Sequence, residues 1–434
     1  MPVISTQGAA SAKGFGFFRL SAAGGYYYKI STIDRYYQPQ FTGVQPLSSG
    51  PAWMISGYRG NGERFAATLD SAGNLVGYKQ DNSNYFFQLY TMAKGGGTQL
   101  STGFIPAWIT SGQDRLAFIS DTPISYNGAA GGKFVPAYAN IGDLVGIDYD
   151  NNYVYSYGFY YSESAYYLWL AATNASTRAG VWVQRYNIGT WGFPNAALIR
   201  PGDTTNVWIQ IGYNAGSSSV GYASFNRSTG ARTGGYYVTG ASTNNTAAGF
   251  VSDPSGNLYT GTFNGQIWRM NTSNTIDWAF YYADSATSQG FGYSFICYYD
   301  GYIYFISTQH PNGNYVGRIN ASNGSVDWAI KITQPFYGCF GISANANGIM
   351  VIGSDNDSNG FKATYLLNYP LTGGITGTKG DFVFSNMTVS ASPLSLTVNS
   401  VTGPSLTSQG APAASTYTSS LVNATSILGS KVVI

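Results

Sequence analysis

The fold is indicated by one segment whose parts recur further along the chain: Val251-Ser-Asp-Pro-Ser-Gly-Asn-Leu-Tyr-Thr-Gly-Thr-Phe-Asn-Gly-Gln-Ile-Trp-Arg-Met-Asn-Thr-Ser-Asn-Thr-Ile-Asp-Trp278. Related segments occupy positions 299–328 and 346–353. Each contains short apolar stretches separated by Gly, Asn, Asp and Ser, the residues that favour tight turns. This repeat predicts an array of β-sheets between Gly249 and Phe384.

The composition favours β-structure throughout the chain. The 434 residues are 44% hydrophobic and 16% aromatic, enough for a large core, but only 9% are charged. An ordinary soluble domain has about 25% charged residues. The excess lies in 56 Gly and 37 Tyr, and the only glutamates are Glu63 and Glu163. Tyrosine suits half-buried strands, and good helix formers are scarce, so we expect an all-β protein.

The charge pattern excludes two classes of partner. The net charge is +2, from 21 basic and 19 acidic residues, and no basic cluster occurs. Such a chain has no field that would concentrate nucleic acid. The apolar runs are shorter than the ~20 residues that a membrane helix needs. We therefore expect neither nucleic-acid binding nor membrane insertion.

The first residues, Met1 to Lys13, lack the basic region and apolar core of a secretory signal. The low charge and the abundance of Ser, Thr, Asn, Gly and Tyr are nevertheless typical of an extracellular surface. A virion protein satisfies both observations, because it is made in the host cytoplasm and released by lysis. We therefore predict a virion location.

The turn Asp-x-x-Gly-Asn-Leu occurs at residues 70–75 and 253–258 and predicts hairpins with one residue at positive φ. Related turns near positions 150, 202, 300 and 347 give a period of about 46–52 residues. Two similar segments, 51–57 and 106–112, add units near positions 65 and 118. The total is about seven units, within a range of six to eight.

A second turn pattern, Asn-x-Ser/Thr, occurs in residues 225–230, 270–274 and 319–324. Asn and Gly tolerate left-handed backbone, and Ser or Thr can bond its own backbone, so the pattern predicts a turn between strands. The same triplets match N-glycosylation acceptors. Because the start shows no secretory signal, we favour the turn.

Four-stranded units of this length are typical of β-propeller blades, and closure into a ring leaves few exposed sheet edges. Over residues 50–384 the pattern resembles the quinoprotein-type and other Trp-bearing propeller repeats. We interpret Trp278 and Trp328 as blade-to-blade packing. A β-solenoid, whose repeats are shorter, and a string of separate sandwiches, which needs linkers, are the alternatives.

The predicted organisation has three parts: an N-terminal strand and attachment segment (1–45), a β-propeller of about seven four-stranded blades (46–384) and a Ser/Thr-rich C-terminal arm (385–434). The only charged side chain of the arm is Lys431. The arm cannot form its own core, but residues 389–401 alternate well enough to add a strand to another surface. We expect it to order on assembly.

Candidate catalytic residues are few. His310, the sole histidine, lies in a predicted hairpin tip, so a multi-His zinc site is excluded and a Ser-His-Asp triad is disfavoured. Asp148 with Asp150, and Asp355 with Asp357, are the acidic pairs that glycoside hydrolysis would require, but no spacing favours either pair.

Cofactor and metal sites have weak signals. Residues 355–360 match the opening of a calcium loop, but its twelfth position is Leu366 where a bidentate Glu is required. No phosphate-binding loop occurs, and the shortage of charge argues against a bound quinone. We therefore predict no catalytic residue, no cofactor-binding residue and no metal ligand, and a protein that is not an enzyme.

Two residue types leave alternatives open. Cys297 and Cys339 are either buried small hydrophobic residues or a disulfide between adjacent sheets. The tyrosine-rich segments 157–161, 166–167 and 236–237 either fill blade interfaces or stack on the sugars of a host surface glycan.

The opening residues 4–17, Ile-Ser-Thr-Gln-Gly-Ala-Ala-Ser-Ala-Lys-Gly-Phe-Gly-Phe, resemble the N-terminal segment of structural proteins from tailed bacteriophages. Those proteins begin Ser-Thr-Arg-Gly-Ala-Ala-Ser-Ala-x-Ala/Gly-Phe-Gly, and their bodies vary.

This resemblance implies a non-enzymatic virion protein of the tail fibre, baseplate or capsid surface, with the propeller as a display or host-binding platform. Its expected partners are other virion proteins, bound through residues 4–17 and 385–434, and a homo-oligomer is expected. A glycan hydrolase and a lectin-like propeller are the alternatives.

Overall fold

The computed structural model describes residues 24–31, 40–47, 51–59, 63–81, 88–90, 104–110, 115–121, 124–126, 144–162, 165–177, 179–187, 191–213, 219–241, 247–262, 264–292, 294–309, 313–334, 338–357, 360–401, 405–409, 421–422, 428 and 430–434. Within these ranges every regular element is a β-strand, which confirms the all-β prediction. Among the same residues there is no helix of the length and apolarity that a membrane crossing requires.

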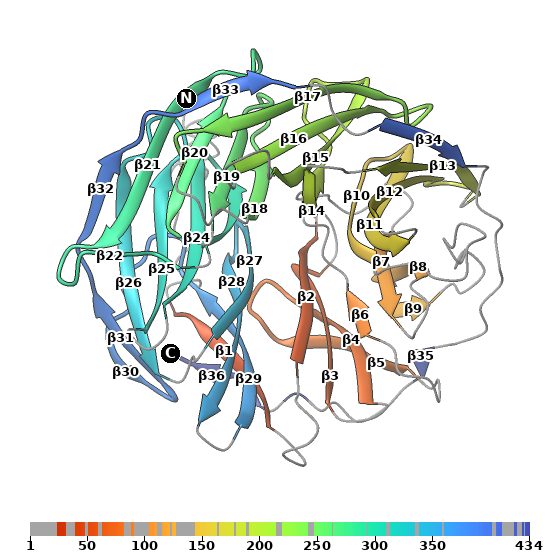
Figure 1. The fold of residues 1–434 in the computed structure, drawn as a ribbon. Coiled ribbons are helices and arrows are strands. Elements are labelled where there is room, and N and C mark those ends of the chain that lie inside the picture. The colour runs from red at the N-terminus through yellow and green to blue at the C-terminus, as the bar shows by residue number, and fades with distance from the viewer. Residues whose placement is uncertain are drawn as a thin grey trace, which may run out of the picture.

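The strands form antiparallel sheets arranged around a central axis, which confirms a β-propeller with four-stranded blades (Figure 1). The first blade contains β2 (Gln40–Pro46), β3 (Trp53–Arg59), β4 (Glu63–Leu69) and β5 (Leu75–Asp81). The second contains β10 (Leu144–Tyr149), β11 (Tyr153–Ser162), β12 (Ala165–Asn174) and β13 (Gly180–Asn187). The third contains β14 (Trp191–Leu198), β15 (Asn206–Tyr213), β16 (Ser219–Asn226) and β17 (Arg232–Thr239).

The fourth blade contains β18 (Ala247–Ser252), β19 (Leu258–Thr262), β20 (Gln266–Met270) and β21 (Ile276–Asp284), with a short strand β22 (Gln289–Gly290) on β21. The fifth contains β23 (Ser294–Tyr299), β24 (Tyr302–Gln309), β25 (Gly313–Asn320) and β26 (Val326–Gln334). The sixth contains β27 (Gly338–Asn345), β28 (Gly348–Asp357), β29 (Gly360–Tyr369) and, from the other end of the chain, β1 (Tyr26–Ser31).

A smaller sheet lies between the first and second blades. It contains β6 (Gln88–Tyr90), β7 (Phe104–Thr110), β8 (Arg115–Asp121) and β9 (Ile124–Tyr126). Its two outer strands, β6 and β9, have three described residues each, so they are shorter than the outer strands of the six full blades. The sequence predicted about seven similar blades; the described residues instead form six full blades and this small sheet, because the unit predicted near position 118 has only two strands of full length.

Strand β1 closes the ring. It pairs antiparallel with β29 over six residues, from Tyr26↔Asn368 to Ser31↔Ala363, and so supplies the fourth strand of the sixth blade. β2 then opens the first blade. The predicted domain boundary at 45/46 therefore falls inside β2, and the strands described before it, β1 and the first part of β2, belong to the sixth and first blades.

The C-terminal segment runs back around the circumference of the propeller. We call residues 382–434 the belt. It contains β31 (Phe382–Asn386), β32 (Val389–Pro393), β33 (Thr397–Ser400), β34 (Ser405–Gln409), β35 (Leu421–Val422) and β36 (Val432–Val433), preceded by β30 (Gly377–Lys379) in a hairpin with β31.

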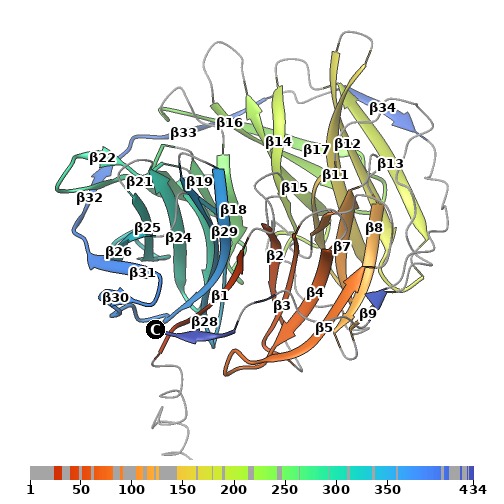
Figure 2. The same ribbon diagram turned by 90° about the horizontal axis from the view of Figure 1, so that it is seen from below.

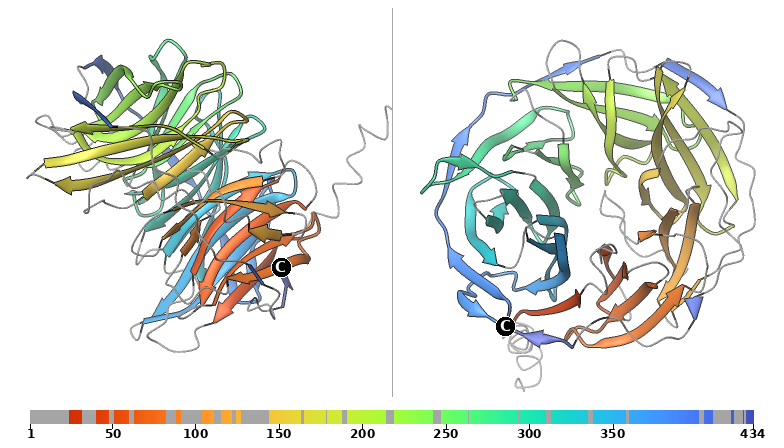
Figure 3. Two further views of the ribbon diagram at one scale, coloured as in Figure 1. Left: turned by 90° about the vertical axis from the view of Figure 1, so that its right-hand side faces the viewer. Right: turned by 60° about the horizontal axis from the view of Figure 1, so that its bottom comes forward.

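The belt strands pair in reverse order with the outer strands of the six full blades, from the fifth blade back to the first and finally onto β1. Figure 3 shows the belt strands along the rim of the ring, and Figure 2 shows the same path from below. The alternating segment 389–401 does add strands, as predicted, but it adds them to this chain's own blades, so the expectation of an arm that orders on assembly is wrong for these strands. The boundary predicted at 384/385 lies within β31.

Apolar clusters fill the spaces between neighbouring blades. The cluster between the second and third blades includes Tyr155, Leu168, Ile209 and Phe225, all fully buried. Comparable clusters lie between each later pair of blades and between the sixth and first. Stability therefore depends on each blade burying both of its faces against neighbours.

The two cysteines are both free, which settles the alternatives left open by the sequence. Both lie in or against the apolar cluster between the fifth and sixth blades. Partial burial raises the pKa of the Cys297 thiol far above its ordinary value, which disfavours the reactive thiolate.

A chain ending at Thr388 tests the belt. Removing residues 389–434 exposes the outer edges of β21, β17, β13, β5 and β1. Open edges template pairing with other chains, so we expect a lower melting temperature and concentration-dependent self-association in size-exclusion chromatography with light scattering. A shortened chain that melts and elutes like the full chain at the same concentration would contradict this role.

Candidate functional site

Aspartates close four turns at one end of the blades. Asp70 lies in the turn between the third and fourth strands of the first blade, and Asp150, Asp203 and Asp253 lie in the turns between the first and second strands of the next three blades. Asp70, Asp150, Asp203 and Asp253 accept main-chain N–H bonds of 2.7–2.9 Å from residues three or four positions later. In two of these turns a glycine adopts the predicted positive φ: Gly73 (80°) and Gly256 (83°). These carboxylates are consumed by turn formation.

The turns between third and fourth strands lie at the same end, because adjacent strands are antiparallel. Their asparagines accept N–H bonds from the residue two positions later: Asn174 from Ser176, Asn226 from Ser228, Asn271 from Ser273 and Asn320 from Ser322, at 2.9–3.0 Å. The Asn-x-Ser pattern is therefore turn chemistry, as predicted.

Tryptophans on the outer strands bind each blade to the next. The indole Nε1 of Trp182 donates to the carbonyl of Arg227 at 2.9 Å, Trp278 to that of Ala321 at 3.1 Å, and Trp328 to that of Leu371 at 3.1 Å. Each acceptor lies in the turn after the third strand of the following blade. The prediction of blade-to-blade packing is confirmed for Trp278 and Trp328, and the hydrogen bond adds direction to that packing.

Each of these tryptophans lies against a glycine of the same turn. A Cβ on Gly230 would come within 2.7 Å of Trp182, on Gly324 within 2.8 Å of Trp278, and on Gly373 within 2.9 Å of Trp328. All three glycines have positive φ. Glycine is thus required twice at each position, for the turn conformation and for the approach of the ring.

The junction of the third and fourth blades uses an arginine. In the second and fifth blades the tryptophan follows the turn asparagine by eight residues, as Trp182 follows Asn174 and Trp328 follows Asn320. The same position in the third blade, eight residues after Asn226, is Gly234. The buried Arg200 binds the next blade instead. Its guanidinium donates to the carbonyls of Gly256 and Asn271 and, at 2.9 Å, to Oδ1 of Asn274.

Sequence reasoning missed Arg200. The only signal was the absence of a tryptophan at position 234, together with an arginine beside the turn at 200–203.

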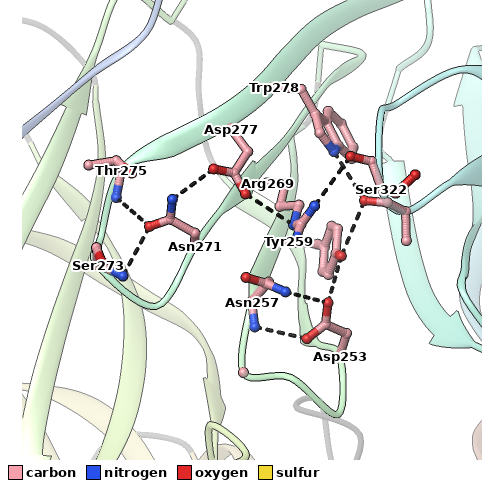
Figure 4. Close-up of polar contacts among 12 residues, drawn as sticks. Asp253, Asn257, Tyr259, Arg269, Asn271, Ser273, Thr275, Asp277, Trp278 and Ser322 are labelled. Atoms are coloured by element: carbon pink, nitrogen blue, oxygen red, sulfur yellow. Dashed lines mark hydrogen bonds and ion pairs between the residues drawn. The ribbon is translucent and has the colours of Figure 1, made fainter.

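Figure 4 shows the corresponding contacts between the fourth and fifth blades. Asp253 accepts a bond from the Asn257 amide at 2.7 Å and another from the Tyr259 hydroxyl at 2.9 Å. Arg269 forms an ion pair with Asp277 at 3.3 Å and donates to the carbonyl of Ser322 at 3.2 Å. The polar groups in this view are bonded to one another, which leaves a rigid junction.

The carboxylates of Asp148 and Asp150, one of the two acidic pairs considered from the sequence, are both engaged in structural contacts. Asp148 is buried, and its carboxylate accepts N–H bonds from Tyr149 at 2.9 Å and Ile199 at 2.6 Å. Asp150 accepts bonds in its own turn and pairs with Arg227 at 2.9 Å. Burial raises the pKa of Asp148 to about 7, against the opposing effect of those two N–H bonds. Asp148 thus joins two blades.

The other predicted candidates are placed as follows. Asp355 and Asp357 belong to β28, and Asp357 pairs with Gly360 of β29. The two strands are therefore paired up to these residues, which agrees with a turn between strands rather than a calcium loop. His310 lies outside the described residues. No group of three or more potential metal ligands occurs among the residues that the structure describes.

The described tyrosines of the predicted aromatic segments pack inside the ring. Tyr157 is fully buried, Tyr167 is nearly so beneath the guanidinium of Arg185 at 4.4 Å, and Tyr236 stacks on Trp208 at 6.1 Å. Tyr157 and Tyr236 belong to the apolar clusters between blades, which agrees with the packing alternative for these two rings.

Comparison with known proteins finds similarity to solved structures alone, at low sequence identity. No protein-family model and no curated protein matches it. Among solved structures it is similar to Sqt1 of Saccharomyces cerevisiae, at 10% identity over 78% of this chain and 98% of that one, with a TM-score of 0.42. Sqt1 of Chaetomium thermophilum, bound to the N-terminus of ribosomal protein L10, matches at 12% identity over 78% and 99%, with a TM-score of 0.42. BamB of Moraxella catarrhalis matches at 14% identity over 62% and 80%, with a TM-score of 0.34.

Replacing Trp278 by Phe tests the inter-blade hydrogen bond. The variant keeps an aromatic ring beside Gly324 but leaves the Ala321 carbonyl without the indole donor. We expect a loss of about 2–3 kcal/mol in the free energy of unfolding, measured by urea titration. Val181→Ala, at a position 36% exposed, should stay within about 0.5 kcal/mol of the parent. Equal losses in the two variants would contradict the assignment.

The pH dependence of stability tests Asp148. Its folded pKa of about 7 exceeds the ordinary 3.8, so the folded state holds a proton that the unfolded chain has released. The contribution is full below about pH 4 and is lost as the pH rises towards about 7. In Asp148→Asn this slope should disappear, whereas Asp300→Asn, on an exposed turn, should keep it. The measurement is the melting temperature of each variant at pH values from 4 to 8. If its dependence on pH is the same in Asp148→Asn as in the parent, Asp148 does not titrate in this range.

Proposed function

We propose that this chain is a non-enzymatic structural protein of a phage virion, in which the β-propeller is a rigid display or host-binding platform. The observation that carries the proposal is the segment 4–17, which resembles the N-terminal segment of tailed-phage structural proteins. The low charge and the abundance of Ser, Thr, Asn, Gly and Tyr support a protein carried on the surface of the particle.

The use of polar groups supports a non-catalytic role. Catalysis requires titratable groups that converge on a cleft and whose hydrogen-bonding positions are open to a substrate. The described aspartates instead close turns or join blades, as Asp150, Asp203 and Asp253 do. The described polar residues therefore favour a body that holds its shape over one that performs chemistry.

The belt limits where attachment can occur. From the sequence, both residues 4–17 and residues 385–434 are expected to contact other virion proteins. The belt strands use their main-chain groups on the chain's own blades, so we assign attachment to residues 4–17 alone. The chain leading from that segment enters the propeller at β1, the strand that closes the ring. A load applied through the segment would thus act directly on the closure.

Deletion of residues 4–17 tests the proposal. These residues lie before β1 and supply no described strand, so the shortened propeller should fold with an unchanged melting temperature. We expect the full chain in purified particles and the shortened chain only in the lysate, as measured by mass spectrometry. A variant with residues 4–17 in scrambled order is the matched control and should also be lost.

Three results would argue against this function: absence of the full chain from particles, retention of the shortened chain, or release of oligosaccharide from host surface polysaccharide by the purified protein. The last result would favour the glycan-degrading alternative.

A further inference from the structure

The last residues of the chain occupy the outer edge of the closing strand. β36 pairs antiparallel with β1, with Val433 opposite Tyr26 and Val432 opposite Tyr27. The pairing continues beyond the strand, because the N–H of Ile434 donates to the carbonyl of Gly25 at 2.8 Å. β1 therefore lies between β29 and the chain's own C-terminus.

Side chains alternate between contact and solvent along this segment. Val432 and Ile434 pack against the apolar cluster between the fifth and sixth blades, whereas Val433 is 68% exposed. Leu428, a few residues earlier, is buried in the cluster between the sixth and first blades. An added strand with pockets for alternate side chains is the arrangement by which sheets recognise extended peptides.

A basic side chain is recognised at the position before this apolar pair. Nζ of Lys431 donates to Oδ1 of Asn74 at 2.8 Å and to the carbonyl of Ala72 at 3.1 Å, and it lies 5.6 Å from the ring centroid of Tyr26. Both acceptors belong to the β4–β5 turn of the first blade. Carbonyl, amide oxygen and aromatic face together favour an ammonium group.

The main chain just before β1 is shaped for this close contact. A Cβ on Gly25 would come within 2.6 Å of the Asn368 carbonyl and 3.0 Å of the Ile434 side chain. Only glycine fits between the Asn368 carbonyl of β29 and the Ile434 side chain. The fit therefore depends on residues from β1, β29 and the first blade.

We propose that Gly25, Tyr26, Asn74 and the adjoining apolar cluster form a peptide-binding site on β1. Its ligand is the end of an extended chain with the pattern Lys-apolar-x-apolar. The chain's own Lys431–Ile434 fills the site in cis, and the same segment of a second copy fills it when the resident strand is absent. This site is independent of the proposed virion function, because its evidence comes from contacts within the propeller.

A chain ending at Ile427 and a synthetic peptide of residues 428–434 test the site. We expect the peptide to bind the shortened chain saturably in calorimetry and to restore protection of the Tyr26–Ser31 amides in hydrogen exchange. A Val433→Ser peptide should bind like the native one, because that side chain is exposed. Val432→Ser and Lys431→Glu peptides should each bind about tenfold or more weakly.

The same substitutions in the full chain cover the case in which the shortened chain does not fold. Val432→Ser should raise amide exchange in β1 above that in Val433→Ser, with no comparable rise in β17, which pairs with the belt elsewhere. Equal binding by all peptides, no binding by the native peptide to a folded shortened chain, or an equal rise in every strand would overturn the proposal.

Discussion

The rest of the structure depends on one pairing, that of β1 with β29. Described apolar clusters fill the spaces between successive blades from the second to the sixth and between the sixth and the first, so the ring is stable only when the last blade meets the first. The six-residue ladder between Tyr26–Ser31 and the strand ending at Tyr369 makes that connection between distant parts of the chain. Pairing β1 with β29 closes a loop of more than 300 residues. The entropy lost in closing it grows only with the logarithm of the loop length, so one well-paired strand can offset this loss.

The junctions between blades combine neutral and charged donors. Three of them use an indole N–H and a main-chain carbonyl, which satisfies a buried acceptor without burying an ion. The same junctions also receive an arginine: Arg227 pairs with Asp150, and Arg269 and Arg318 donate to the carbonyls of Ser322 and Leu371. Where the tryptophan position holds Gly234, a buried Arg200 makes three hydrogen bonds that compensate for its desolvation.

Much of this was predictable wherever the cause is local. The positive φ of Gly73 and Gly256 and the packing role of Trp278 follow from turn chemistry and from the repeat. The partner of β1 was not predictable, because alternation of apolar residues indicates a strand without naming its neighbour. Asp148 drew attention as a possible acid, but sequence alone does not show that two N–H groups of neighbouring residues already occupy its carboxylate.

The belt was misjudged because its composition is typical of an unstructured segment. Its strands have two to five residues, and the alternation over residues 389–401 indicates a strand without naming its partner, because the pairing uses main-chain groups that every residue possesses. Side chains of the belt can therefore be small and polar except where they also pack against a core. At those places the residues are apolar: Phe382 and Phe384 at its start, Leu394, Leu396 and Val398 around the third and fourth blades, and Leu428 and Ile434 at its end. The described belt strands are thus held by backbone pairing and, at intervals, by apolar side chains that enter the cores between blades.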